Sequence, residues 1–207
     1  MKIYEYKGFP NPARVRMALA ELGLMDKVEF ITVDVTKGHH KKPEFVAKNP
    51  FPAVPVLELD DGTNIAECTA ITEYLDNLNG GPSNLTGKTA KQRGIVHMMQ
   101  KRAESALLDA VAAYFHHATP GLGPDVEEFQ CKEWGLHQRK RAIKGMQYFD
   151  SVLKTHPYVA GDEFSMADIT AFTGLLFADA TSIDIPEECS ALKAWRKKVG
   201  ERSDKVG

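Results

Sequence analysis

The pattern of the sequence changes at residues 79–88, which read NGGPSNLTGK and are rich in turn-forming residues. Before this segment, short stretches suited to strands are interspersed with stretches at helical spacing. After it, apolar residues recur only at helical spacings of three and four. The change predicts an α/β domain over 1–80, a linker over 81–88 and an all-α domain over 89–207.

The first half predicts the order β-α-β-α-β-β-α, which is a thioredoxin-like arrangement. Two strands end in a hairpin whose Asp61-Gly62 pair suits a tight turn. Pro12 and Gly23 mark the start and stop of the first helix. The expected strands cover 2–6, 28–34, 54–59 and 63–67, and the expected helices cover 12–23, 42–49 and 67–78.

The second half predicts helices only, over 89–118, 125–154, 165–180 and 188–200. One helix start has a clear local signal, because Ser165 is placed to cap a helix whose third residue is Asp168. Phe164 and Ile169 stand at the positions of a hydrophobic staple around it. We expect this box to be structural, with no part in chemistry.

Composition excludes several classes of function. The chain has 207 residues, 43% of them hydrophobic, and a net charge of −2, which argues against a general binder of nucleic acid or anionic membranes. The N-terminus lacks an apolar signal segment and no apolar run could cross a membrane, so we expect a soluble, cytoplasmic protein. The three cysteines lack CxxC spacing, so neither a metal site nor a disulfide framework is expected.

Four segments together resemble the cytosolic glutathione transferases, and the resemblance covers nearly the whole chain. It implies a thioredoxin-like domain followed by a helical one, reduced glutathione as cosubstrate without a prosthetic group, and a homodimer. Phe51 is a candidate contact with the partner subunit; the alternative is packing on its own chain. The segments are PARVRMALAE at 12–21, GHHKKPEFVAKNPF at 38–51, VPVLELDDG and IAECTAITEYL within 54–75, and FSMADIT at 164–170.

The resemblance implies where glutathione would bind. In the family the Pro55 position is a cis-proline, which turns the backbone of Val54 toward the ligand so that it pairs like a short added strand. Glu67 and Cys68 begin the third helix, where free N–H groups attract the γ-glutamyl carboxylate. Glu67 would face the ligand's ammonium. The family usually has serine where this chain has Cys68, so we expect weaker binding there.

The basic run before Pro43 supplies the candidates for the glycyl carboxylate. By resemblance these are His40 and Lys41, and the alternative is a solvated basic loop. Ala53 stands where the family often has glutamine or lysine, so His40 and Lys41 would carry more of that contact.

The usual thiol activator is missing, as in some atypical bacterial and fungal members. The segment after the first strand, YEYKGFPNPARVR, has no serine, threonine or cysteine, and Phe9 stands where serine is common. Tyr6 and His116 remain as candidate catalytic residues, with His117 and Thr119 as weaker alternatives to His116. Tyr6 could equally be a packed strand aromatic, and the histidines could simply favour the helix C-terminus.

These observations favour a glutathione transferase that stabilises the glutathione thiolate and conjugates it to apolar electrophiles. Phe9, Tyr114 and Phe115 are the expected walls of the electrophile pocket, since such clefts are mostly apolar. The alternative is a non-catalytic glutathione- or ligand-binding module of the same fold, or a protein-interaction domain.

Overall fold

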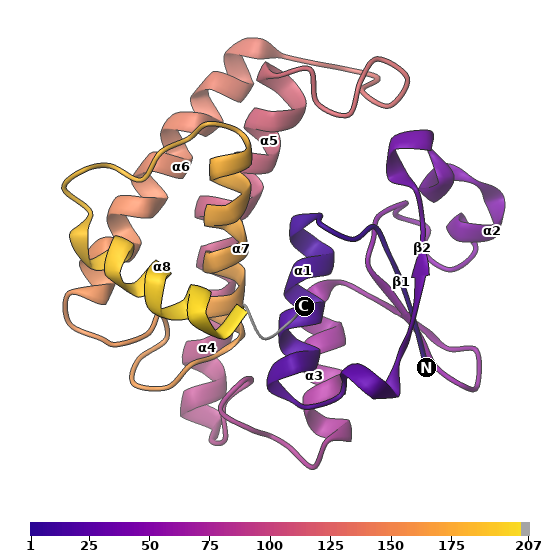
Figure 1. Cartoon of the computed structure of the whole chain (residues 1–207), viewed down its shortest axis with the longest axis horizontal. Helices are drawn as coiled ribbons and strands as arrows, with labels where there is room; N and C mark the ends of the chain where they lie inside the picture. Colours follow the sequence, from indigo (N-terminus) through magenta and orange to yellow (C-terminus); the bar gives the residue numbers. More distant parts are fainter. Residues whose placement is uncertain (204–207) are drawn as a thin grey trace. The chain divides into compact units, whose positions relative to one another are not determined.

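The computed structural model describes residues 1–203, which form two compact units divided after Gly81 (Figure 1). The first unit runs from Met1 to Gly81 and the second begins at Pro82. Within the described residues, no helix has the length and apolar character needed to cross a membrane.

The first unit is a mixed sheet of short strands with helices on both faces, which confirms the thioredoxin-like prediction. The strand order is β2-β1-β3-β4; β1 pairs in parallel with β2, while β3 is antiparallel to both β1 and β4. The strands are β1 Lys2–Glu5, β2 Glu29–Thr32, β3 Val56–Glu58 and β4 Asn64–Ala66, and the helices are α1 Pro10–Glu21, α2 Pro43–Val46 and α3 Cys68–Leu78.

The predicted strands are each longer than the observed ones. The predicted helix at 42–49 is likewise longer than the observed one, because α2 is a single turn. Two 3₁₀ turns precede it, η2 Val35–Lys37 and η3 His39–Lys41. A further 3₁₀ turn, η1 Met25–Lys27, precedes β2.

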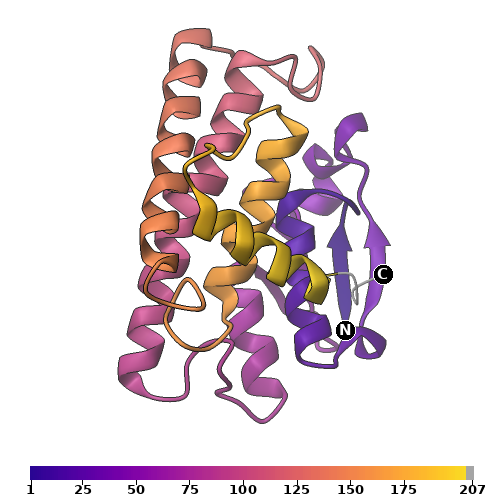
Figure 2. The same cartoon turned by 60° about the vertical axis from the view of Figure 1, so that its left-hand side comes forward.

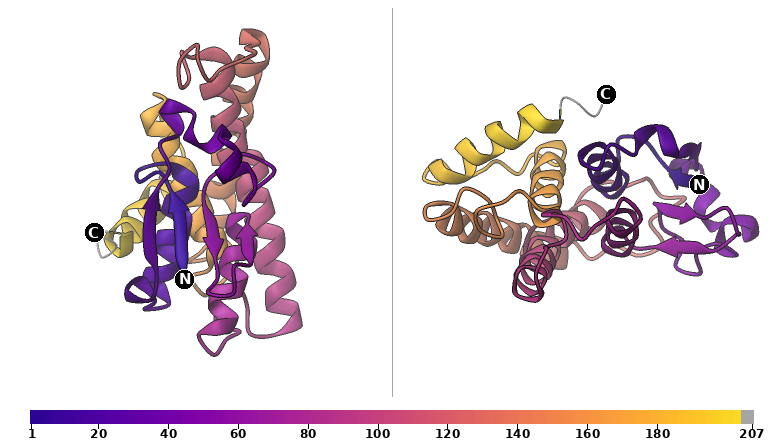
Figure 3. Two further views of the ribbon diagram at one scale, coloured as in Figure 1. Left: turned by 90° about the vertical axis from the view of Figure 1, so that its right-hand side faces the viewer. Right: turned by 90° about the horizontal axis from the view of Figure 1, so that it is seen from below.

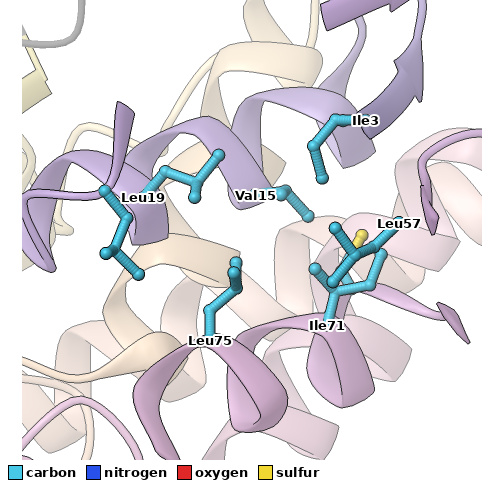
Figure 4. Close-up of a cluster of buried hydrophobic side chains, with 8 residues drawn as sticks. Ile3, Val15, Leu19, Leu57, Ile71 and Leu75 are labelled. Carbon is cyan, nitrogen blue, oxygen red and sulfur yellow. The ribbon is translucent and has the colours of Figure 1, made fainter. Parts of the chain in front are cut away.

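The alternation of side chains along the strands divides the core between the two faces of the sheet. Leu57 joins Ile3 on the face covered by α1 and α3, whereas Val56 points to the face covered by Phe45 of α2. Helices α1 and α3 lie side by side on one face of the sheet (Figure 3). Figure 4 shows the side chains that meet there, from β1, β3, α1 and α3: Ile3, Val15, Leu19, Leu57, Ile71 and Leu75.

The sheet register brings several chain segments to one edge. Tyr4 near the end of β1 lies opposite Val56 at the start of β3, and Val56 lies opposite Ala66 at the end of β4. Glu5 pairs with Thr32 at the end of the parallel strand β2. The residues just after β1, β2 and β4 and just before β3 therefore all lie at this edge.

The second unit is helical, as predicted, with α8 packed across α6 and α7 (Figure 2). The predicted helix at 89–118 contains a π-helical turn, and the predicted helix at 125–154 was wrong at its start, because the helix begins at Lys132. The elements are α4 Ala90–Ala103, the π turn η4 Glu104–Leu108, α5 Asp109–Ala118, α6 Lys132–Leu153, α7 Met166–Ala180 and α8 Ser190–Ser203.

Two glycines accommodate the π turn, whose backbone is wider than that of an α-helix. A Cβ added to Gly145 of α6 would lie 2.3 Å from the carbonyl oxygen of Ala106. A Cβ added to Gly174 of α7 would lie 3.0 Å from the Leu107 side chain. Both neighbouring helices thus approach the π turn at a residue without a side chain.

Asp168 of the second unit is a fully buried carboxylate that accepts several hydrogen bonds. Its Oδ2 accepts from the Ser165 N–H at 3.0 Å, as expected of the capping box, and also from the Ser165 hydroxyl at 3.0 Å. Its Oδ1 accepts from the Val159 N–H at 2.8 Å and from Nε1 of Trp195 at 3.1 Å. The carboxylate that the capping box predicts at the start of α7 therefore also links α7 to the preceding loop and to α8.

We predict that Asp168→Ala lowers the free energy of unfolding by at least about 3 kcal/mol, because it leaves several buried N–H groups without an acceptor. Asp162→Ala, a change at a nearby exposed carboxylate, should change stability by less than about 0.5 kcal/mol. Urea unfolding of both variants tests this, and equal losses would contradict it.

Stability should also depend on pH through Asp168. Burial raises the pKa of this carboxyl from 3.8 to about 6. The folded state then holds a proton that the unfolded chain releases, so the contribution of Asp168 falls as pH rises from about 4 to 6. Asp168→Asn, which cannot ionise, should lack this component in unfolding curves taken across that range; an unchanged pH profile would contradict it.

Candidate active site

The edge of the sheet in the first unit gathers several of the predicted site residues. Tyr6, just beyond β1, and Phe9, just before α1, pack with Val54 and Ala66 in one apolar cluster. The Tyr6 and Phe9 rings meet edge to face, with centroids 4.9 Å apart. The Tyr6 ring is therefore a packed aromatic.

Val54 lies at this edge without a partner in the sheet. The peptide bond between Val54 and Pro55 is cis, as the family resemblance implied. The β1–β3 register ends at Val56, and among residues 1–203 no other main-chain group pairs with the Val54 N–H or carbonyl. Its backbone is therefore available to an extended ligand.

A buried asparagine shapes the loop that leads into Val54. The Asn49 side chain is 4% exposed, and its amide nitrogen donates to the Ala53 carbonyl at 3.0 Å. Its oxygen accepts from the Phe51 N–H at 3.1 Å. The Phe51 side chain is directed outward and is 78% exposed, so it does not pack on its own unit.

Glu67 occupies an unusual backbone conformation at the start of α3. It is the exposed N-cap residue, with φ at 70° and ψ at 120°, a region that costs a residue with a side chain about 1–3 kcal/mol. Cys68 follows as the first helical residue, and its buried thiol donates to the Asn11 carbonyl at 3.4 Å. The α3 N-terminus is thus tied to α1, with Glu67 held at the sheet edge.

His40 and Lys41 differ in the charge they can offer. His40 is 8% exposed, and its Nδ1 has no hydrogen-bond partner among residues 1–203. Burial, with the nearby Lys41 ammonium, lowers the pKa of His40 below 6.5. The ring is therefore uncharged at neutral pH, and the positive charge of this run belongs to exposed lysines such as Lys41.

The second unit places the remaining candidates around the end of α5. His116 Nδ1 lies 2.7 Å from Glu127 Oε1, and the His116 side chain is 41% exposed. His117 instead accepts the Cys131 N–H through its Nδ1 at 3.1 Å. The Thr119 hydroxyl donates to the Phe115 carbonyl at 2.6 Å, so Thr119 caps the C-terminal end of α5.

Two of the predicted pocket walls also belong to this unit. Phe115 packs edge to face on Phe177 of α7, with ring centroids 5.4 Å apart, and on the His116 ring. Tyr114 is half-buried in α5. Sequence reasoning missed Glu127, because it fell inside a predicted helix; the polar, Gly- and Pro-containing run 119–131 was the signal for a loop.

We predict that Glu67→Gly is more stable than Glu67→Ala by about 1 kcal/mol, since only glycine adopts positive φ without a steric cost. The same pair of changes at Glu73, in the interior of α3, should give the opposite order by about 1 kcal/mol. Thermal and urea unfolding of the four variants tests this. Alanine more stable than glycine at both sites would show that Glu67 is not strained.

Comparisons with known proteins agree with this geometry. The family model of the glutathione S-transferase N-terminal domain matches residues 10–78, and that of the C-terminal domain matches residues 105–203. Glutathione S-transferase 2 of Saccharomyces cerevisiae is 61% identical over 202 residues, covering 98% of this chain and 86% of that protein.

Solved structures show the same fold. The crystal structure of Gtt2 from Saccharomyces cerevisiae is 59% identical and matches with a TM-score of 0.97, covering 100% of both chains. A glutathione S-transferase domain-containing protein from Marinobacter aquaeolei is 55% identical and matches with a TM-score of 0.96, also over 100% of both chains. The identification made from the sequence is confirmed: this chain belongs to the glutathione S-transferase family.

Proposed function

We propose that this transferase binds reduced glutathione at the sheet edge of residues 1–80 and conjugates its thiolate to an apolar electrophile. The observation that carries the proposal is the meeting, at one edge, of an unpaired backbone at Val54 and a strained acid at Glu67. The basic run 39–42, which contains Lys41, follows β2, and the end of β2 lies at the same edge. These groups are complementary to an extended peptide with an ammonium and two carboxylates.

Each part of glutathione has a partner in this proposal. The cysteinyl unit pairs with the Val54 backbone, whose position beside Pro55 resembles the end of a strand. The γ-glutamyl carboxylate lies at the N-terminus of α3, including the Cys68 N–H, and its ammonium faces Glu67. The glycyl carboxylate meets the Lys41 ammonium, while uncharged His40 offers at most one N–H.

The thiol must also be ionised. A free thiol has a pKa of about 8.5, so a shift of about two units requires roughly 2.7 kcal/mol of preferential stabilisation of the anion. We assign this role to His116, acting directly or through a water. Its accessible ring held by Glu127 supports the assignment, whereas Tyr6, the other candidate, is packed against Phe9.

The remaining assignments follow the family. Phe9, Tyr114 and Phe115 line the electrophile pocket as apolar walls. The enzyme acts in the cytoplasm as a homodimer, and the exposed Phe51 side chain contacts the partner subunit. No prosthetic group is required, and among residues 1–203 no cluster of histidine, cysteine and acidic residues could hold a metal.

The test compares His116→Ala with Tyr6→Phe, using turnover with a model electrophile and the ultraviolet absorbance of the bound thiolate. His116→Ala should lower kcat by about 10²-fold, the scale of a lost general base, and should remove the thiolate absorbance while glutathione still binds. Tyr6→Phe and the control His156→Ala, an exposed histidine, should change neither.

Other outcomes have clear meanings. Loss of the thiolate with Tyr6→Phe but not with His116→Ala would make the tyrosine the activator. Glutathione binding by the unmodified protein without any thiolate signal or turnover would contradict the catalytic proposal and favour a non-catalytic glutathione-binding module.

A further inference from the structure

We infer that Glu127 is a positioning residue for catalysis: it holds His116 in the tautomer that leaves Nε2 free to take the glutathione proton. The inference rests on the proposed function of His116. It adds a residue that lies eleven positions beyond His116 and outside any regular helix or strand.

The contacts of the Glu127 carboxylate determine which ring nitrogen of His116 carries hydrogen. Oε1 lies 2.7 Å from His116 Nδ1 and accepts the Leu122 N–H at 2.8 Å. An ionised carboxylate only accepts hydrogen bonds, so the His116 proton is on Nδ1. Nε2 of the neutral ring then has a lone pair and can act as a base.

The neighbouring histidine is held in the opposite tautomer. His117 Nδ1 accepts the Cys131 N–H at 3.1 Å, so a neutral His117 carries its proton on Nε2. A neutral His117 therefore has no lone pair left for a thiol proton. The structure thereby distinguishes between two adjacent histidines that the sequence leaves equivalent.

The loop after α5 is built around the Glu127 carboxylate. The carboxylate side chain is 10% exposed, whereas the His116 side chain is 41% exposed. Gly121 has φ at +57°, and a Cβ there would lie 2.3 Å from Glu127 Oε1. Gln130 ties the loop to the helix end by donating to the carbonyls of His116 at 2.7 Å and Thr119 at 2.9 Å.

This arrangement gives a balanced proton transfer. The S–H bond of glutathione breaks, its electron pair stays on sulfur, and the proton forms a bond with His116 Nε2. The resulting imidazolium donates from Nδ1 to the Glu127 carboxylate, so the positive charge forms beside an existing negative one. Water takes the proton from Nε2 before the next thiol is ionised.

A double-mutant cycle tests the inference, with kcat, KM for glutathione and the His116 tautomer from nitrogen NMR as readouts. Glu127→Gln keeps the shape and an accepting oxygen but loses the charge. We expect it to lower kcat about tenfold with KM unchanged, and to reduce the Nδ1–H tautomer of His116. In a His116→Ala background the same change should alter kcat by less than about twofold, because the pair acts as a unit.

Gln130→Ala serves as the matched control, because it removes another anchor of the same loop without touching the His116 ring. It should leave kcat and the tautomer unchanged. An equal loss in Gln130→Ala and Glu127→Gln, or effects of Glu127→Gln and His116→Ala that multiply, would show that Glu127 acts only on loop structure and would overturn the inference.

The two proposals fail in different ways. If His116→Ala lowers kcat and Glu127→Gln does not, the role of Glu127 is wrong while the function of His116 stands. If His116→Ala retains full kcat, His116 is not the base, and both assignments are contradicted.

Discussion

The pairing of β1 with two neighbours of opposite direction is the constraint on which the proposed glutathione site depends. Because β2 runs parallel to β1 and β3 runs antiparallel, the ends of β1 and β2 lie at the same edge as the start of β3. The hairpin partner β4 ends at that edge too. Residues distant in the sequence, from Tyr6 to Glu67, are therefore brought to one edge by the pairing of the strands.

Buried or partly buried carboxylates have a comparable organising role in the helical unit, where each accepts more than one hydrogen bond. Asp150 of α6 accepts from the Ala191 and Leu192 N–H groups at 2.9 and 3.1 Å, and so caps α8. Its other oxygen lies 2.7 Å from the Lys154 ammonium, and its pKa is lowered, since these contacts outweigh burial. Asp168 at the start of α7 likewise accepts hydrogen bonds from several segments. Glu127, in the loop after α5, accepts from the Leu122 N–H and lies beside the His116 ring.

Local sequence signals predicted a large part of this structure. The order of elements, the hairpin at Asp61-Gly62 and the capping box at Ser165 follow from patterns that neighbouring residues determine by themselves. The cis bond before Pro55 was implied by family resemblance, because an isolated X-Pro pair does not reveal its isomer.

Features that depend on distant contacts could not be predicted in this way. The π turn at Glu104–Leu108 is approached closely by two other helices, each at a glycine. Burial lowers the pKa of His40. This burial could not be predicted from the sequence, in which His40 stands within a basic run. The contact between Glu127 and His116 could be recognised only in the structure, where the loop after α5 places the carboxylate beside the His116 ring.

The most direct test of the central claim is a calorimetric titration of the purified protein with reduced glutathione. We expect binding in the micromolar to low-millimolar range. Glu67→Ala should weaken it about tenfold, equivalent to about 1.4 kcal/mol for the lost charge, while Glu29→Ala, at the opposite edge of the sheet, should leave it unchanged. No measurable binding by the unmodified protein, or equal affinity in the Glu67 variant, would contradict the site at this edge.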